Sequence, residues 1–233
     1  MTAHGMAAAL AGPPDRAAAL LRAGAEAGLP EAQAAYGQIL LDGQGVAADP
    51  VAALRWFGLA ARAGNLMAVN MVGRCHEKGW GTAPDPVEAA RRYRIAAEGG
   101  LDWGMYNYAG ALGLGAGVAR DEMAALGWFQ RAASLGHAKS INMVGTIAEE
   151  GRLVRRDIGK AAECFARAAQ GGDFRGQFNH ARLLAGAGDI EAALGWIARA
   201  AETATPAFRA RMREWLAAAP LPALRDAAGT IAA

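Results

Sequence analysis

The chain has 233 residues, 53% of them apolar, which is enough to bury a large core. A formal net charge of +2 gives no sign of the concentrated basic face that nucleic-acid binding requires. No uncharged, strongly apolar stretch approaches the roughly 20 residues of a membrane-spanning helix. Residues 1–13 are expected to be a disordered tail. They carry no Lys or Arg before the short Ala-rich run, which argues against a secretory signal and predicts a cytoplasmic location.

From residue 14 onwards the chain repeats itself every 36 residues. We expect an orphan second helix over 14–28 and a C-terminal cap over 203–233. Between them lie five repeats that form one continuous domain, at 29–64, 65–100, 101–136, 137–172 and 173–202, the last one shortened. A period of this length indicates helical hairpins that stack on their neighbours, because each hairpin alone cannot bury its apolar face.

The second repeat shows how each hairpin is expected to form. Leu66–Lys78 and Val87–Glu98 have helical patterns, and a loop joins them. Gly79 is placed to end the first helix in the left-handed conformation. Asp85 is placed to cap the second helix by accepting hydrogen bonds from its free N–H groups. The other repeats carry an aspartate at the same place: Asp49, Asp121, Asp157 and Asp189.

Small residues on the first helices recur opposite large residues on the second helices. Glycine inside a helix costs about 1 kcal/mol relative to alanine, so the repeated Gly37, Gly73 and Gly145 predict close helix crossings. The expected large partners on the second helices are Trp56, Phe57, Tyr93, Trp128, Phe129, Phe165 and Trp196. After the last repeat, an amphipathic pattern predicts a helix that covers the end of the stack, with Phe208, Met212, Trp215 and Leu216 on its apolar face.

Two recurring motifs resemble a known repeat. The first is Gly-x-Gly-Val-x-x-Asp, at Gly43–Asp49 and Gly115–Asp121, and the second is Ala-x-x-Trp-Phe-x-x-Ala-Ala around Trp56. This pattern is similar to the Sel-one-like repeat, a relative of the tetratricopeptide repeat, over residues 29 to 202. The resemblance implies an all-α, right-handed solenoid (superhelix) whose first helices line a concave surface. It also implies a protein–protein interaction scaffold or adaptor rather than an enzyme.

A second resemblance leaves an alternative function open. The segment His180–Leu184 is similar to one found in bacterial relatives that are associated with iron-uptake systems. Those systems contain an Fe(II)-dependent hydroxylase. The resemblance therefore implies, as the alternative, an accessory subunit of an enzyme.

The predicted binding surface consists of first-helix positions three, six, seven and ten, which share one helical stripe. Its members are Met67, Asn70, Met71, Arg74, Trp103, Tyr106, Asn107, Lys139, Asn142, Met143, Arg175, Phe178, Asn179 and Arg182. A row of side-chain amides can donate to and accept from the backbone of an extended peptide. The apolar side chains add contact area, and the basic ones favour an acidic partner.

The asparagines also have a structural interpretation, in which they tie one hairpin to the next. Asn107 and Asn179 hold position seven, whereas Asn70 and Asn142 hold position six. A shift of one residue turns a side chain by about 100°. We therefore expect that the two pairs do not share one structural bond, and that at least one pair binds a partner.

The sequence predicts no metal site and no cofactor. His4, His76, His137 and His180 are scattered, and no HExxH or paired-cysteine spacing is present. His180 is expected to be a packed, hydrogen-bonded core residue. The two cysteines, Cys75 and Cys164, lie more than two repeats apart and are expected to be free thiols. A monomer or a weak homo-oligomer is expected, because the C-terminal cap could dock onto another copy.

Overall fold

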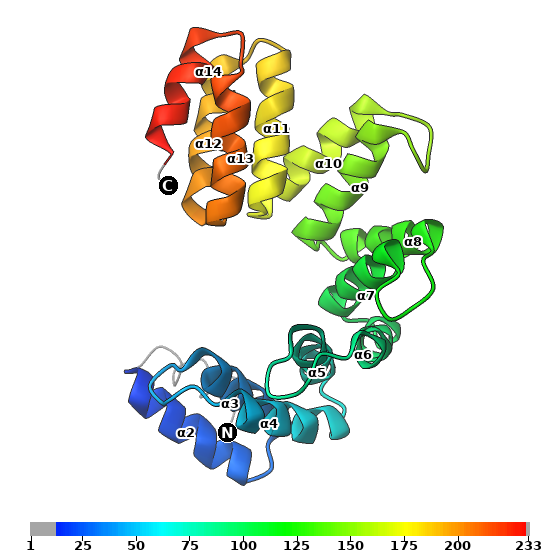
Figure 1. Ribbon diagram of the computed structural model, residues 1–233, viewed down its shortest axis with the longest axis vertical. Coiled ribbons are helices and arrows are strands. Elements are labelled where there is room, and N and C mark those ends of the chain that lie inside the picture. Colours follow the sequence, from blue (N-terminus) through cyan, green and yellow to red (C-terminus); the bar gives the residue numbers. More distant parts are fainter. Residues whose placement is uncertain (1–12, 232–233) are drawn as a thin grey trace. The chain divides into compact units, whose positions relative to one another are not determined.

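The structure is a computed structural model that describes residues 13–231. The predicted tail, apart from Pro13, lies outside the described residues. The described chain consists of helices joined by turns and loops (Figure 1). The helices are α2 (Pro14–Glu26), α3 (Pro30–Asp42), α4 (Pro50–Arg62), α5 (Leu66–Lys78), α6 (Pro86–Glu98), α7 (Asp102–Leu114), α8 (Glu122–Ser134), α9 (Ala138–Glu150), α10 (Ile158–Gln170), α11 (Phe174–Gly186), α12 (Ile190–Thr203), α13 (Pro206–Ala217) and α14 (Pro222–Ala227).

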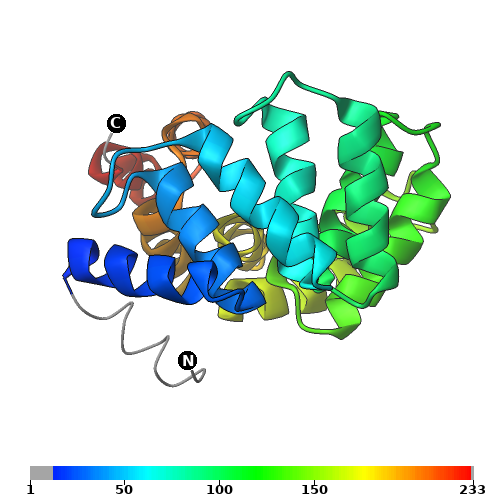
Figure 2. The ribbon, with the colours of Figure 1, turned by 90° about the horizontal axis from the view of Figure 1, so that it is seen from below.

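The chain divides into two compact units, the first ending at Trp128 and the second beginning at Phe129, within α8. In the first unit, α3 packs on α4 and α5 packs on α6, and each hairpin contacts the next helix along the chain. Figure 2 shows these hairpins as pairs of helices joined by a loop. In the second unit, α9 packs on α10 and α11 on α12. The all-α, repeated-hairpin architecture is therefore confirmed.

The expected helix ends are present. Gly79 ends α5 in the left-handed conformation, with φ of 74°. The Asp85 carboxylate accepts hydrogen bonds at 3.0 Å from the backbone N–H groups of Val87 and Glu88, the first residues of α6 after its N-terminal proline. The four equivalent aspartates cap their own helices in the same way. The loop signals in the sequence thus fix where each second helix begins.

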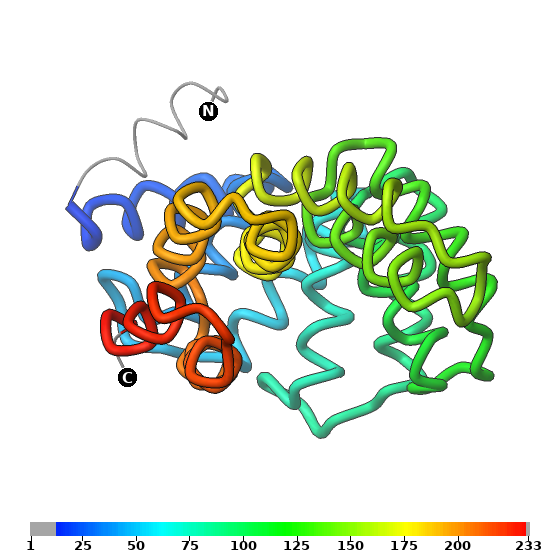
Figure 3. Tube along the Cα trace, turned by 90° about the horizontal axis from the view of Figure 1, so that it is seen from above, coloured from blue at the N-terminus to red at the C-terminus, as the bar shows by residue number. Residues whose placement is uncertain are grey.

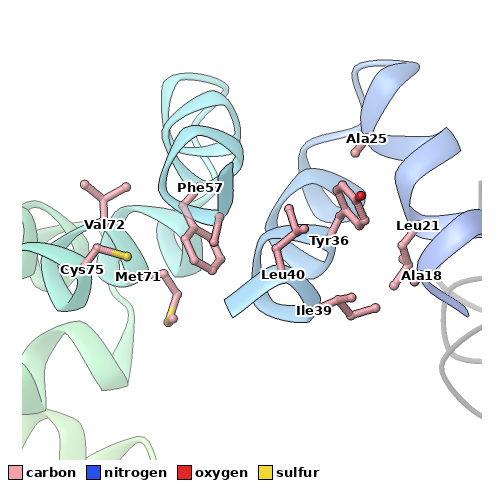
Figure 4. Packing of buried hydrophobic residues seen from close by; sticks show 11 residues of the cluster. Ala18, Leu21, Ala25, Tyr36, Ile39, Leu40, Phe57, Met71, Val72 and Cys75 are labelled. Atoms are coloured by element: carbon pink, nitrogen blue, oxygen red, sulfur yellow. The ribbon is translucent and has the colours of Figure 1, made fainter. Parts of the chain in front are cut away.

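The glycines of the first helices allow the predicted close crossings. A Cβ atom added at Gly73 would lie 2.8 Å from the ring of Tyr93, and one added at Gly37 would lie 2.8 Å from the ring of Phe57. Figure 4 shows Phe57 between side chains of α3 and side chains of α5. A methyl group at either glycine would push the aromatic ring away, so glycine allows these two helix pairs to cross at this distance without strain.

The core alternates between two kinds of repeat. In the first, third and fifth repeats an aromatic ring of the first helix meets a tryptophan of the second helix edge-on. The ring centroids lie 5.7 Å apart for Tyr36 and Trp56, 5.7 Å for Tyr108 and Trp128, and 5.5 Å for His180 and Trp196. The second and fourth repeats carry valines at the place of these first-helix rings, Val72 and Val144. The structural period is therefore two repeats.

The cap covers the last hairpin of the second unit, as the sequence predicts. Met212 and Leu216 of α13 are fully buried, in one cluster with Ala181 of α11 and Ile197 of α12. Figure 3 shows α13 and α14 at the orange and red end of the chain. The apolar face of the last repeat is thereby removed from solvent.

Candidate partner-binding site

The third position of successive first helices points an accessible side chain outward. Met67 of α5 is 42% exposed and Trp103 of α7 is 37% exposed, and these two helices are in direct contact. The Trp103 ring meets Tyr106 edge-on, with centroids 6.2 Å apart. In the second unit the same position holds Lys139, which is half-buried, and Arg175, which is exposed. This position therefore gives each unit an accessible stripe.

The four asparagines form two hydrogen-bonded pairs between neighbouring repeats. Asn107 Nδ2 donates to Asn70 Oδ1 at 2.8 Å in the first unit, and Asn179 Nδ2 donates to Asn142 Oδ1 at 2.9 Å in the second. Each pair joins position six of one repeat to position seven of the next. The expectation that the one-residue shift prevents a shared structural bond is therefore wrong, because the shift is what brings donor and acceptor together.

The acceptors of these pairs lie inside the protein. Asn70 is 2% exposed and Asn142 is 4% exposed, which corrects the expectation that they face a partner. A buried amide costs free energy unless it is hydrogen-bonded, and the asparagine of the following repeat provides that bond. Asn107 and Asn179 are half-buried at the edge of the same first-helix face.

Two apolar members of the predicted surface also belong to the interior. Met71 is 6% exposed and packs in the cluster that contains Leu40 and Phe57. Phe178 is 7% exposed, because the cap helix α13 places Phe208 and Trp215 against it, at centroid distances of 5.7 and 5.4 Å. For both residues, packing against the next element excludes the role of an open contact for a partner.

The basic members of the predicted surface differ in their surroundings. The guanidinium of Arg182 is paired with the Glu149 carboxylate, with Nη2 to Oε2 at 2.9 Å. Arg175 lies over the ring of Phe174 at 4.6 Å and is exposed. Arg74 lies over the ring of Trp80 at 5.1 Å and is half-buried. Met143, the remaining member of the predicted set, is half-buried.

His180 packs against an aromatic ring as expected, but it is half-buried rather than part of the buried core. Its ring meets Trp196 edge-on, and burial lowers the pKa of its imidazole. Among residues 13–231, no three His, Cys, Asp or Glu side chains lie close enough together to hold a metal ion. Cys75 and Cys164 are both free and buried, as expected.

Sequence reasoning missed Trp80, which lies in the loop after α5 and contacts Arg74. Trp80 lies outside the helical stripe that defines the predicted binding surface. A signal was present, because the same loop position holds Gln44, Ala116 and Arg152 in the other full repeats. An aromatic residue in a column of polar and small residues marks a local feature.

The family model for the Sel1 repeat matches residues 30–65, 66–101, 104–137, 138–173 and 176–202. The chain belongs to the Sel1 repeat family. The five matches include every hairpin from α3–α4 to α11–α12, and the resemblance identified in the sequence is thereby confirmed.

Solved structures agree with this assignment. A Sel1 repeat protein from Oxalobacter formigenes is 26% identical, with a TM-score of 0.80 over 95% of this Sel1 repeat chain and 93% of its own. The protective antigen c5321 of uropathogenic Escherichia coli, which has an SLR fold, is also 26% identical. Its TM-score is 0.68 over 92% of this chain and 47% of its own. The immunity protein Pa5087 from Pseudomonas aeruginosa is 15% identical, with a TM-score of 0.59 over 87% of this chain and 80% of its own, which shows a common fold alone.

No curated protein sequence matches the Sel1 repeat chain. Within the described residues, every helix is too short or too polar to cross a lipid bilayer.

Proposed function

We propose that this Sel1 repeat chain is a non-catalytic scaffold or adaptor that binds a partner protein or an extended peptide along the face of its first helices. One observation carries the proposal. Met67 and Trp103 hold the same position in consecutive repeats, and both stay accessible on packed neighbouring helices. Large apolar side chains at matched positions form a contact surface, and Trp is prominent among residues that dominate binding energy.

The surrounding side chains support a protein partner. Tyr106 extends the aromatic area beside Trp103, while the half-buried Asn107 lies on the same helix. Sel1 repeat proteins are generally protein-interaction scaffolds. Binding of a short segment that orders on contact is expected with an affinity on the order of micromolar.

The test is co-purification of the tagged full-length chain from its native cell, with quantitative mass spectrometry of the wild type and Trp103→Ala. Val87→Ala is the matched control, because Val87 is 63% exposed but lies on the second helix α6. We expect one partner to be lost with Trp103→Ala and retained with Val87→Ala. Equal recovery of every bound protein from the wild type and Trp103→Ala would contradict the proposal.

The same experiment addresses the alternative function. An accessory subunit would bring down one dominant catalytic protein, and that enzyme would lose activity without this chain. A Fe(II)-dependent hydroxylase among the recovered proteins would favour this alternative over a general adaptor.

A further inference from the structure

A pocket of about 410 Å³ opens beside the first two repeats, within the first unit. Three of its six lining residues come from the end of α3 and three from the elements that follow. They are Gln38, Leu41, Asp42, Pro50, Arg74 and Trp80. Gln38 and Arg74 both hold position ten of their repeats, so the pocket lies on the predicted binding surface.

Arg74 presents a charged group at this pocket, and its charge helps to lower the pKa of Glu77, one turn along α5, without a direct ion pair. Within residues 13–231, no carboxylate oxygen is within ion-pairing distance of its guanidinium. The guanidinium instead lies over the Trp80 ring at 5.1 Å, and its Nη1 is 3.9 Å from the sulfur of Met71. Stacking on an aromatic ring holds a guanidinium in place and leaves its in-plane N–H groups able to donate.

The chain itself shows how such an arginine is satisfied elsewhere. Arg182 holds position ten of the fifth repeat, and Glu149 holds position thirteen of the fourth. Their side chains meet, with Arg182 Nη2 at 2.9 and 3.2 Å from the two carboxylate oxygens of Glu149. Position thirteen of the first repeat, which precedes the repeat of Arg74, is Leu41. Leu41 lines the pocket and cannot supply a carboxylate.

We propose that the Arg74 pocket binds a carboxylate of a partner segment, in the role that the Glu149 carboxylate has at Arg182. This inference rests on the proposed function and specifies the chemistry of the partner. The carboxylate comes from an acidic side chain or from a chain end. Charge-assisted hydrogen bonds from an arginine to a carboxylate are among the stronger and more directional contacts in proteins.

Asp42 determines which kinds of carboxylate ligand the pocket favours. Its own carboxylate lines the pocket and accepts a hydrogen bond from Gln38 Nε2 at 2.8 Å. An inorganic anion without an O–H group, such as chloride or sulfate, has no donor for this acceptor and is repelled by its charge. A peptide offers N–H donors next to its carboxylate, so the pocket favours peptides over small anions.

The test uses three five-residue peptides and the full-length protein. One peptide carries a central glutamate and blocked ends, one carries a central glutamine and a free C-terminus, and one has a central glutamine and blocked ends. Binding is followed by the indole N–H resonance of Trp80, assigned with Trp80→Phe. We expect a carboxylate peptide to shift this resonance with a Kd on the order of millimolar, and the fully blocked peptide to leave it unchanged. Whichever of the first two peptides has the lower Kd shows whether the carboxylate comes from an acidic side chain or from a chain end.

Two substitutions, each with a control variant, test the assignment to Arg74. Arg74→Gln should weaken binding at least tenfold, whereas Arg182→Gln, which removes an arginine already paired with Glu149, should leave the Trp80 response unchanged. Leu41→Glu should also abolish binding, because it supplies an internal carboxylate at the position of Glu149. Leu41→Gln, of the same shape but uncharged, is its control. Equal shifts with all three peptides, or full binding by Arg74→Gln, would overturn the proposal.

Two further measurements guard against ambiguous results. Leu41 packs against the core cluster of the first unit, so a thermal melt must accompany its variants. Asp42→Asn, at an exposed side chain, should strengthen binding of the carboxylate peptides several-fold by removing the repelling charge.

Failure of this inference is distinct from failure of the proposed function. A partner lost by Trp103→Ala but retained by Arg74→Gln would leave the scaffold proposal intact and remove the carboxylate pocket.

Discussion

Asn107 donates a hydrogen bond to Asn70 across one repeat boundary, and Asn70 is only 2% exposed. The pair explains why asparagine, a poor residue for a helix interior, is present at this depth. One side chain needs an acceptor and the other a donor, and both lie where two first helices meet.

Removal of this donor should destabilise the first unit. Asn107→Ala leaves the buried Asn70 oxygen without its partner, and we expect a loss of about 1–3 kcal/mol in the free energy of unfolding. Urea unfolding of Asn107→Ala, Asn70→Ala and the double variant measures the coupling between the two side chains. Gln44→Ala, at an exposed loop side chain, is the control. Unchanged stability of Asn107→Ala would show that the bond contributes nothing.

The helix glycines differ in what alanine would meet. Gly73→Ala places a methyl group 2.8 Å from the Tyr93 ring, and we expect a loss of about 1–3 kcal/mol from overpacking. Gly110→Ala on α7 has nothing within 4 Å, and we expect it to stabilise the protein by up to about 1 kcal/mol. Calorimetric melting of the two variants should therefore show shifts of opposite sign. Shifts of the same sign would contradict the crossing assigned to Gly73.

Acidification should remove the contribution that Glu88 on α6 makes to the free energy of unfolding through its pairs with Arg91 and Arg92. The Arg91 side chain, by hydrogen-bonding to Glu88, lowers the pKa of that carboxyl from its ordinary 4.5 to about 2, and Arg92 adds to the effect. A lowered pKa means that this contribution is present above pH 4.5 and is lost as the pH falls towards 2. Because solvent screens these pairs, it stays below about 1 kcal/mol.

The variant that isolates this contribution is Glu88→Gln. Its deficit in free energy of unfolding relative to the wild type should be constant from pH 7 to pH 5 and should shrink between pH 5 and pH 3. Chemical denaturation at each pH measures it. A deficit that grows on acidification would show that the sign is wrong.

The buried thiols should be unreactive in the folded protein. Burial raises the pKa of the Cys75 thiol to about 11, and its side chain is fully buried, so little thiolate exists or is accessible at pH 8. We expect a thiol-reactive disulfide reagent to label neither cysteine within minutes in buffer and both in urea. Rapid labelling of Cys75 in buffer would indicate opening of the core around α5.

The sequence was sufficient to predict the fold, because a repeat fixes helix positions many times over. Each of the five loop aspartates caps a helix, and the glycine column faces the aromatic column as expected. These features depend on contacts within one hairpin or with the adjacent one. Local spacing is enough to reveal them.

The site was predicted less well, because exposure depends on neighbours that a helical stripe does not reveal. Phe178 lies on the same stripe as Asn179, yet the cap helix buries it. Asn70 is buried, and the donor that satisfies it, Asn107, belongs to the next repeat, which a helical stripe within one repeat does not show. The contact of Trp80 with Arg74 depends on the path of a loop, which helical spacing does not predict.

The alternation of the core shows that the structural unit of this array is a pair of repeats. Position six holds the acceptor asparagine in the second and fourth repeats, and position seven holds the donor asparagine in the third and fifth. An even-numbered repeat and the odd-numbered repeat after it are therefore the smallest module in which this hydrogen bond is complete. Deletion of residues 65–136 would remove one such module, and the remaining repeats would still alternate between odd-type and even-type. Excision of 65–100 alone would place two odd copies in succession, without an acceptor for the Asn107 amide. Lengthening or shortening of this protein, by engineering or by gene duplication, should therefore succeed in steps of 72 residues rather than 36.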